Sequence, residues 1–119
     1  MKDVPLVVLV VDDEPGVRAI TSLHLRRAGY TVLEASGGAE ALSVLESRSD
    51  VALVLIDCDM RGMSGPETDM IILARWPHIR ILAMSGRPPA PDLPDEVNFI
   101  PKPFKGADLV ARVRNVLNH

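Results

Sequence analysis

The chain has one cysteine, few aromatic residues and no long apolar run. Because Cys58 has no second cysteine to pair with, no internal disulfide can form, and this fits a reducing cytoplasm. Aromatic residues make up 3% of the sequence, which leaves few rings on which nucleic-acid bases could stack. No run reaches the roughly 20 apolar residues that cross a bilayer. We therefore expect a cytoplasmic protein with no membrane insertion and no direct contact with nucleic acid.

The charge balance and the length indicate a small globular protein. The formal net charge is −3, so a strongly basic surface for nucleic acid is not indicated. Apolar residues make up 47% and charged residues 24% of the 119 positions, which is typical of a soluble domain. This length suits one hydrophobic core, so we expect a single domain over residues 1–119.

Five short apolar runs recur along the sequence, and helix-like segments separate them. The runs lie at residues 6–11, 31–34, 51–56, 79–84 and 97–100. Continuous apolar runs of this length are typical of parallel strands that are buried on both faces. The alternation of strands and helices predicts an α/β fold in which helices cover both faces of a parallel sheet.

Local signals mark the ends of the helices. Pro15 suits the first turn of a helix, and Gly29 suits its end. Ser36 is a candidate N-cap for the next helix, and Gly65 opens the third. The last helix starts near residue 106 and carries an apolar stripe at positions 109, 110, 113, 116 and 117.

Three acids directly follow two of the apolar runs. Asp12 and Asp13 come after the first run, and Asp57 comes after the third. Because ligands of such sheets bind at the carboxyl ends of the strands, we expect these acids to converge at that edge. Carboxylates at close range repel each other and need a cation, and hard oxygen ligands suit Mg²⁺. The pattern predicts a magnesium site for phosphoryl chemistry.

Two further polar residues stand at expected strand ends. Ser85 follows the fourth run, and Lys102 follows the fifth. The lysine ammonium can neutralise a phosphoryl oxygen, and the serine hydroxyl can donate a hydrogen bond to another. Asp57 can then act as a nucleophile and form a mixed anhydride. The metal and the lysine would offset the charge of the transferring group.

Four segments together carry a family resemblance. They are VVDDEP at 10–15, DCDMRGMSG at 57–65, MSG at 84–86 and PKPF at 101–104. In this order and at these distances they resemble response regulator receiver domains over essentially the full length of the chain. The resemblance implies a flavodoxin-like three-layer α/β sandwich with a five-stranded parallel sheet of order 2-1-3-4-5.

The resemblance also implies a role for each acid. Asp57 would accept a phosphoryl group from a phosphohistidine of a sensor histidine kinase or a histidine phosphotransfer protein, and would thereby switch partner interactions. Asp13 and Asp57 would bind Mg²⁺ together with the backbone carbonyl of Asp59, and Asp12 would act mainly through metal-bound water. Such a domain is a signalling phosphoacceptor and not an enzyme that turns over a small substrate.

Further positions match the family in the second half of the chain. Ser85 and Lys102 would hold phosphoryl oxygens. Phe99 stands at the family's aromatic switch position, and the Lys102–Pro103 bond matches one that is usually cis. The segments around Ser85 and Lys102 look more like receivers of hybrid histidine kinases, which leaves open whether the chain is a stand-alone regulator or part of a kinase.

Three features depart from the family pattern. Arg61 stands where the family usually has proline, and Phe99 lacks the hydroxyl of the common tyrosine. Between Ser85 and Lys102 the chain is several residues shorter than in the family, and residues 86–96 hold four prolines, which a regular helix does not accommodate. We therefore expect the fourth helix of the family to be shortened or absent.

Other interpretations stay open. A pseudo-receiver would bind partners without accepting phosphate, although its usual mark, loss of an acid or of the lysine, is not seen here. Asp57 and Asp59 also resemble the paired acids of haloacid-dehalogenase phosphohydrolases, although Arg61 replaces the usual threonine or valine. A homodimer is a further option, because residues 70–74 are apolar on almost every side of a helix.

Overall fold

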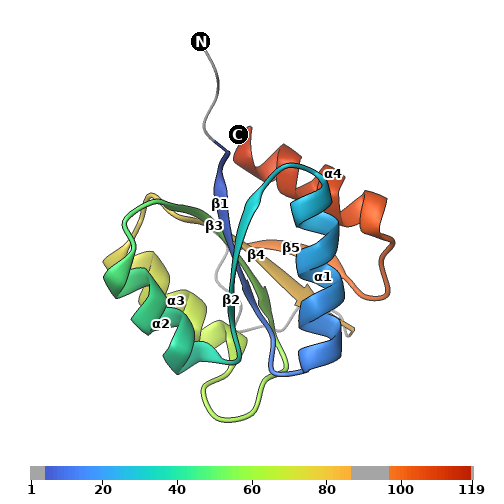
Figure 1. The fold of residues 1–119 in the computed structure, drawn as a ribbon. Coiled ribbons are helices and arrows are strands. Elements are labelled where there is room, and N and C mark those ends of the chain that lie inside the picture. The colour runs from blue at the N-terminus through green and yellow to red at the C-terminus, as the bar shows by residue number, and fades with distance from the viewer. Residues whose placement is uncertain (1–4, 87–96, 119) are drawn as a thin grey trace.

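The computed structural model describes residues 5–86 and 97–118, and within these ranges it contains five strands and four helices (Figure 1). The strands are β1 (Val7–Val11), β2 (Thr31–Ala35), β3 (Val51–Asp57), β4 (Arg80–Ser85) and β5 (Asn98–Pro101). The helices are α1 (Pro15–Arg27), α2 (Gly38–Ser47), α3 (Gly65–Arg75) and α4 (Gly106–Leu117). The five predicted strands are all present, and their ends differ from the predicted ends by a residue at most.

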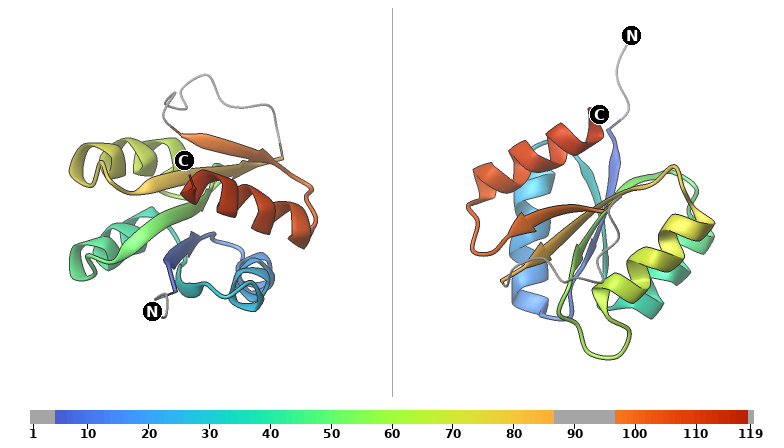
Figure 2. Two further views of the ribbon diagram at one scale, coloured as in Figure 1. Left: turned by 90° about the horizontal axis from the view of Figure 1, so that it is seen from above. Right: turned by 180° about the vertical axis from the view of Figure 1, so that it is seen from behind.

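All five strands are parallel and form one sheet in the order β2-β1-β3-β4-β5. Figure 2 shows α1 and α4 on one face of this sheet and α2 and α3 on the other. The contacts of α1 with α4 and of α2 with α3 agree with this arrangement. The predicted flavodoxin-like, three-layer α/β sandwich is therefore confirmed.

The middle of the sheet is buried on both faces, which explains the uninterrupted apolar runs. Successive side chains of β3 point to opposite faces. Leu53 and Leu55 belong to the apolar cluster beneath α1 and α4, and Val54 and Ile56 belong to the cluster beneath α2 and α3. Each fully buried side chain of this kind contributes roughly 1.5–3 kcal/mol to stability.

Three of the sequence signals for helix ends are confirmed and one is wrong. Pro15 begins α1 and Gly65 begins α3 as predicted. Gly29 follows α1 with a φ of 99°, which favours glycine. The predicted N-cap of α2 is wrong, because Gly37 is the N-cap residue and has no side-chain bond. Ser36 instead donates its N–H to the Glu40 carboxylate at 3.0 Å. Glu40 thus reaches back a full turn and satisfies the backbone group that precedes the helix.

The expected loss of the family's fourth helix concerns a segment of which residues 87–96 lie outside the described residues. The apolar stripe of α4 is confirmed, because Leu109, Val113 and Val116 are buried. Neither α4 nor any other helix in the described part of the chain is long and apolar enough to cross a bilayer.

The helix α3 contains a buried acid. Asp69 is 0% exposed, and neither of its carboxylate oxygens has a hydrogen-bond partner within the described residues. Loss of hydration raises the pKa of the Asp69 carboxyl to about 7, from an ordinary value of 3.8. The packed structure therefore favours the neutral acid. Its residue type gave no sign of this burial, because acids in helices are mostly exposed.

Asp69 is expected to make the protein less stable as the pH rises. Below about pH 4 the carboxyl is protonated in both the folded and the unfolded state. Between there and a pH of about 7, only the unfolded state is ionised, so stability falls with rising pH and then levels off. Asp69→Leu should remove this loss, which is on the order of 4 kcal/mol over the whole window. Urea denaturation of the wild type and of Asp69→Leu at several pH values measures this change in the free energy of unfolding.

Asp108→Asn is the matched control for this series, because Asp108 is an exposed acid on α4. Its substitution should change the free energy of unfolding by less than about 1 kcal/mol at every pH. If Asp69→Leu differs from the wild type by the same amount at about pH 5 and about pH 8, a titrating buried carboxyl is not the cause.

Candidate functional site

The carboxyl ends of four strands bring the predicted site residues to one edge of the sheet. Asp12 follows β1, Asp57 ends β3 and Ser85 ends β4. Lys102 follows β5, and its backbone N–H donates to the Ser85 carbonyl at 2.7 Å. Residues that are separated by up to ninety positions along the chain are thus neighbours in the fold.

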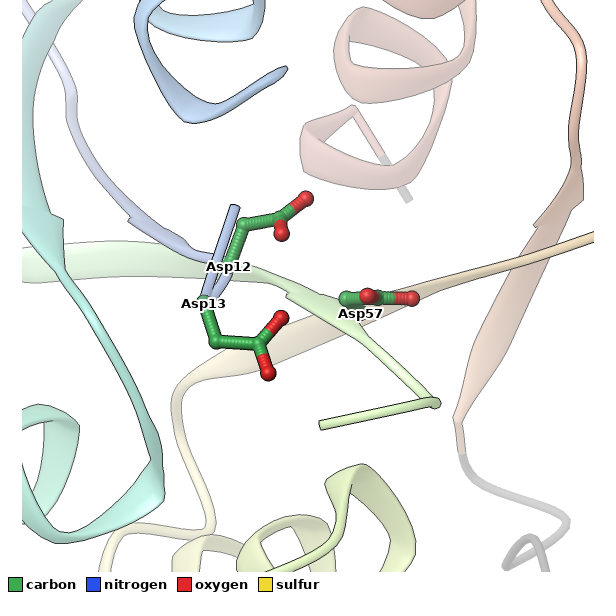
Figure 3. Close-up of side chains that lie close together, drawn as sticks. All are labelled: Asp12, Asp13 and Asp57. Carbon is green, nitrogen blue, oxygen red and sulfur yellow. The ribbon is translucent and has the colours of Figure 1, made fainter. Parts of the chain in front are cut away.

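Asp12, Asp13 and Asp57 form an acidic cluster. One carboxylate oxygen of each residue lies within 4.8 Å of the corresponding oxygens of the other two. Figure 3 shows these side chains at the adjacent ends of β1 and β3. Asp12 and Asp57 are buried and Asp13 is half-buried, so water screens their mutual repulsion only weakly. Among the described residues, no other group of acids, histidines or cysteines is close enough to hold a metal ion.

Hydrogen bonds fix the backbone and one carboxylate oxygen of Asp12. Its Oδ1 accepts a hydrogen bond from the Glu14 N–H at 2.9 Å, and its own N–H donates to the Ala35 carbonyl at 3.2 Å. Its Oδ2 is buried and has no hydrogen-bond partner in the described part of the chain. Burying such an oxygen without a partner is costly, and a cation beside it would remove that cost. The three carboxylates, which are hard oxygen ligands, therefore fit Mg²⁺.

Asp57 lies between these acids and a lysine. The Lys102 Nζ is 3.3 Å from the Asp57 Oδ1, and the Asp59 N–H donates to the same oxygen at 3.3 Å. Burial raises the pKa of the Asp57 carboxyl, whereas the Lys102 charge and the Asp59 N–H oppose this rise. The net direction is upward. A bound cation would act in the same sense as the lysine and would favour the ionised carboxylate.

The loop after β3 supplies backbone contacts to the cluster. The Arg61 N–H donates to the Asp13 Oδ2 at 3.0 Å. This bond uses a donor that proline, the usual residue of the family here, does not have. Asp59 is exposed, and its carboxylate is not part of the acidic cluster. The use of its backbone carbonyl as a metal ligand stays a prediction.

The remaining predicted positions lie along β4 and β5. The Lys102–Pro103 peptide is cis, as the resemblance implies. Phe99 is half-buried and packs against the apolar cluster beneath α2 and α3, and its carbonyl accepts a hydrogen bond from the Arg112 guanidinium. Ser85 is buried. A switching role for Phe99 and contacts of Ser85 and Lys102 with a phosphoryl group stay predictions.

Two residues that the sequence did not single out as site residues contact this region. Arg18, on α1, donates from Nη1 to the Asp12 carbonyl at 2.7 Å. Gly65 is the first residue of α3, and a Cβ there would lie 2.5 Å from the Asp57 carbonyl oxygen and 2.7 Å from the Cys58 Cα. Neither contact is visible in the sequence, because both depend on how a helix packs against the sheet edge.

The fold and the acidic site define an α/β protein of flavodoxin-like topology with a candidate metal site at the carboxyl edge of its sheet. The sequence model of the response regulator receiver domain matches residues 8–114. The chain therefore belongs to the response regulator receiver domain family.

Known relatives agree with this assignment. The sensor kinase CckA of Brucella abortus (strain 2308) is 35% identical over 116 aligned positions, which cover 92% of this chain and 12% of that protein. The solved receiver domain of the hybrid histidine kinase CckA is 32% identical, with a TM-score of 0.81 over 93% of this chain and 98% of that chain. The response regulator TrrA of Thermotoga maritima, solved in complex with Mg²⁺-BeF, is 28% identical, with a TM-score of 0.84 and the same coverage. The chain spans about half or less of the length of the curated relatives it matches.

Gly65→Ala is expected to destabilise the protein and to disturb Asp57. The added Cβ would meet backbone atoms of Asp57 and Cys58 that cannot move aside as a flexible side chain would. We expect a loss of about 2–3 kcal/mol in the free energy of unfolding. Denaturation of this variant and of Gly16→Ala, a matched glycine at the start of α1, measures the effect.

The Gly16 control should respond in the opposite direction. A Cβ at Gly16 meets nothing within 4 Å, so alanine there should stabilise α1 by about 0.5–1 kcal/mol. A Gly65→Ala variant that is as stable as the wild type would show that α3 does not approach the end of β3 this closely.

Proposed function

We propose that this receiver domain accepts a phosphoryl group from a phosphohistidine onto Asp57, in a Mg²⁺-dependent reaction, and switches partner interactions when it is modified. The observation that supports this most directly is the setting of Asp57. Its carboxylate lies beside two further acids and 3.3 Å from the Lys102 ammonium. The similarity to TrrA, which was solved in complex with Mg²⁺-BeF, is in line with a cation at such a site.

In the proposed step, an oxygen of ionised Asp57 forms a bond to phosphorus while the bond from phosphorus to the donor imidazole nitrogen breaks. The electron pair of the breaking bond goes to that nitrogen, which takes up a proton, and the mixed anhydride stays on Asp57. Lys102 compensates charge on one phosphoryl oxygen, and the Ser85 hydroxyl donates to another. Because both residues stand at strand ends, they need little rearrangement when the donor binds.

Asp12, Asp13 and Asp57 are the proposed residues that hold the cation, with the backbone carbonyl of Asp59 as a further ligand. Bound Mg²⁺ would supply positive charge that offsets the phosphoryl oxygens during transfer. The Oδ2 of Asp12, which has no hydrogen-bond partner among the described residues, gives this cation a buried oxygen close by, and the Arg61 N–H bonds to Asp13 in the cluster.

The proposed donor is a sensor histidine kinase or a histidine phosphotransfer protein. We propose that residues 1–119 form one receiver domain that acts in the cytoplasm as a signalling phosphoacceptor. The matched relatives include sensor kinases and transcriptional regulators, and this domain would serve as the phosphoacceptor in either setting. Its only self-catalysed reactions would be its own phosphorylation and dephosphorylation.

Acetyl phosphate with Mg²⁺ is expected to add one phosphoryl group to the wild type and none to Asp57→Asn, because the amide is not a nucleophile toward phosphorus. Intact-mass spectrometry measures the gain in mass. Chelation of Mg²⁺ with EDTA should slow the labelling by roughly a hundredfold or more, since the charge of the transferring group is then poorly offset.

Asp108→Asn removes an exposed carboxylate on α4 and should label like the wild type. A folded wild type that gains no mass, or a gain that persists in Asp57→Asn, would refute the proposed acceptor role. Steady release of phosphate from sugar phosphates would instead favour the phosphohydrolase interpretation.

A further inference from the structure

Arg18 links the first helix to the backbone of the acidic cluster. Its Nη1 donates to the Asp12 carbonyl at 2.7 Å, and its own N–H donates to the Glu14 carbonyl at 2.9 Å. Its Nε donates to the Glu34 carboxylate at 3.2 Å, across to β2. The side chain of Arg18 thus connects three parts of the fold beside the site, namely α1, β2 and the turn that follows β1.

The contact with Asp12 falls at the peptide group that joins the two neighbouring acids. The carbonyl of Asp12 belongs to the same planar peptide unit as the N–H of Asp13. A bond to this carbonyl therefore restrains the direction in which both side chains leave the backbone. The other bonds of Asp12 hold its N–H and its Oδ1, so the Arg18 bond completes the set and leaves only Oδ2 without a partner in the described residues.

Charge alone gives this arginine no favourable role in cation binding. A guanidinium beside three carboxylates lowers the negative potential that attracts a cation. Glu34 offsets this effect, because its carboxylate pairs with Arg18 and also with Arg26, at 3.3 Å. The side chain of Arg18 is 20% exposed, whereas that of Arg26 is 51% exposed. The charge of Arg18 therefore disfavours cation binding, whereas its hydrogen bond to Asp12 favours it by orienting the acids.

We infer that Arg18 is a positioning residue for the cation site, which orients Asp12 and Asp13 through the Asp12 carbonyl and is itself oriented by Glu34. The inference rests on the proposed function, because it concerns the same Mg²⁺ site. According to this inference, the ion pair of Arg18 on α1 with Glu34 on β2 contributes to metal binding. Groups that orient metal ligands in this way commonly change affinity by roughly tenfold or more when they are removed.

Isothermal titration calorimetry with Mg²⁺ alone tests this inference on wild type, Arg18→Gln and Arg26→Gln. If Arg18 positions the acids, Arg18→Gln should weaken Mg²⁺ binding by roughly tenfold. If only its charge matters, the same variant should bind Mg²⁺ more tightly, because a positive charge has been removed. Arg26→Gln removes the same charge from the same helix and the same Glu34 partner, but Arg26 has no bond to Asp12. It should bind Mg²⁺ at least as tightly as the wild type.

Arg18→Lys and Glu34→Gln separate positioning from a general loss of stability. Lysine keeps the charge and one donor nitrogen, so it should recover part of the affinity that glutamine loses. Glu34→Gln should weaken binding by about two- to threefold, because it loosens Arg18 and removes the charge that offsets it, while the three acids of the cluster stay unchanged. Thermal unfolding without metal checks that each variant is folded before titration. If Arg18→Gln is not folded, Arg18→Lys replaces it in the titration.

The outcomes distinguish this inference from the proposed function. A folded wild type that binds no Mg²⁺ overturns both. A wild type that binds Mg²⁺, together with Arg18→Gln that binds as tightly or more tightly, overturns only the positioning role. Equal weakening in Arg18→Gln and Arg26→Gln also overturns it, because the contact with Asp12 would then be irrelevant.

Discussion

Repulsion between the carboxylates of Asp12, Asp13 and Asp57 is the constraint on which the site depends. Because the facing oxygens lie within 4.8 Å of one another, each pair of full charges repels by at least roughly 3 kcal/mol at an effective dielectric constant of about 20. The ten buried apolar residues of β1 and β3 each contribute roughly 1.5–3 kcal/mol. Burial of the strands opposes the repulsion and holds the acids at the same edge of the sheet. Lys102 offsets part of the charge, and the rest favours a cation.

The helical layers reinforce this edge of the sheet by different means. From one face, α1 contributes a charged side chain, Arg18, that bonds to the backbone after β1. From the other face, α3 contributes a close backbone approach, which Gly65 permits because it has no Cβ. The Arg18 hydrogen bond depends mainly on the direction of the donor, whereas the approach at Gly65 depends mainly on the distance between the two backbones. Together they limit how far either strand end can move when a charge nearby changes.

Much of this arrangement was predictable from the sequence, because it follows from local patterns. Continuous apolar runs identified the strands, and the acids that follow them identified the edge at which Asp57 and Lys102 meet. The prediction that Ser36 caps α2 was wrong, because the Ser36 N–H donates to the Glu40 carboxylate and Gly37 is the N-cap residue. Asp69 and Arg18 were missed for a different reason. Their roles arise from burial and from bonds between elements, and no periodicity or spacing encodes these.

Arg61 shows how a departure from the family pattern can be compatible with the site. Proline at this position could not donate a hydrogen bond, whereas the Arg61 N–H donates to the Asp13 Oδ2 at 3.0 Å. A carboxylate has about four lone-pair sites, so this bond leaves Asp13 free to bind a cation as well. Loss of the rigid ring is thereby offset by a bond that only a residue with an N–H can make.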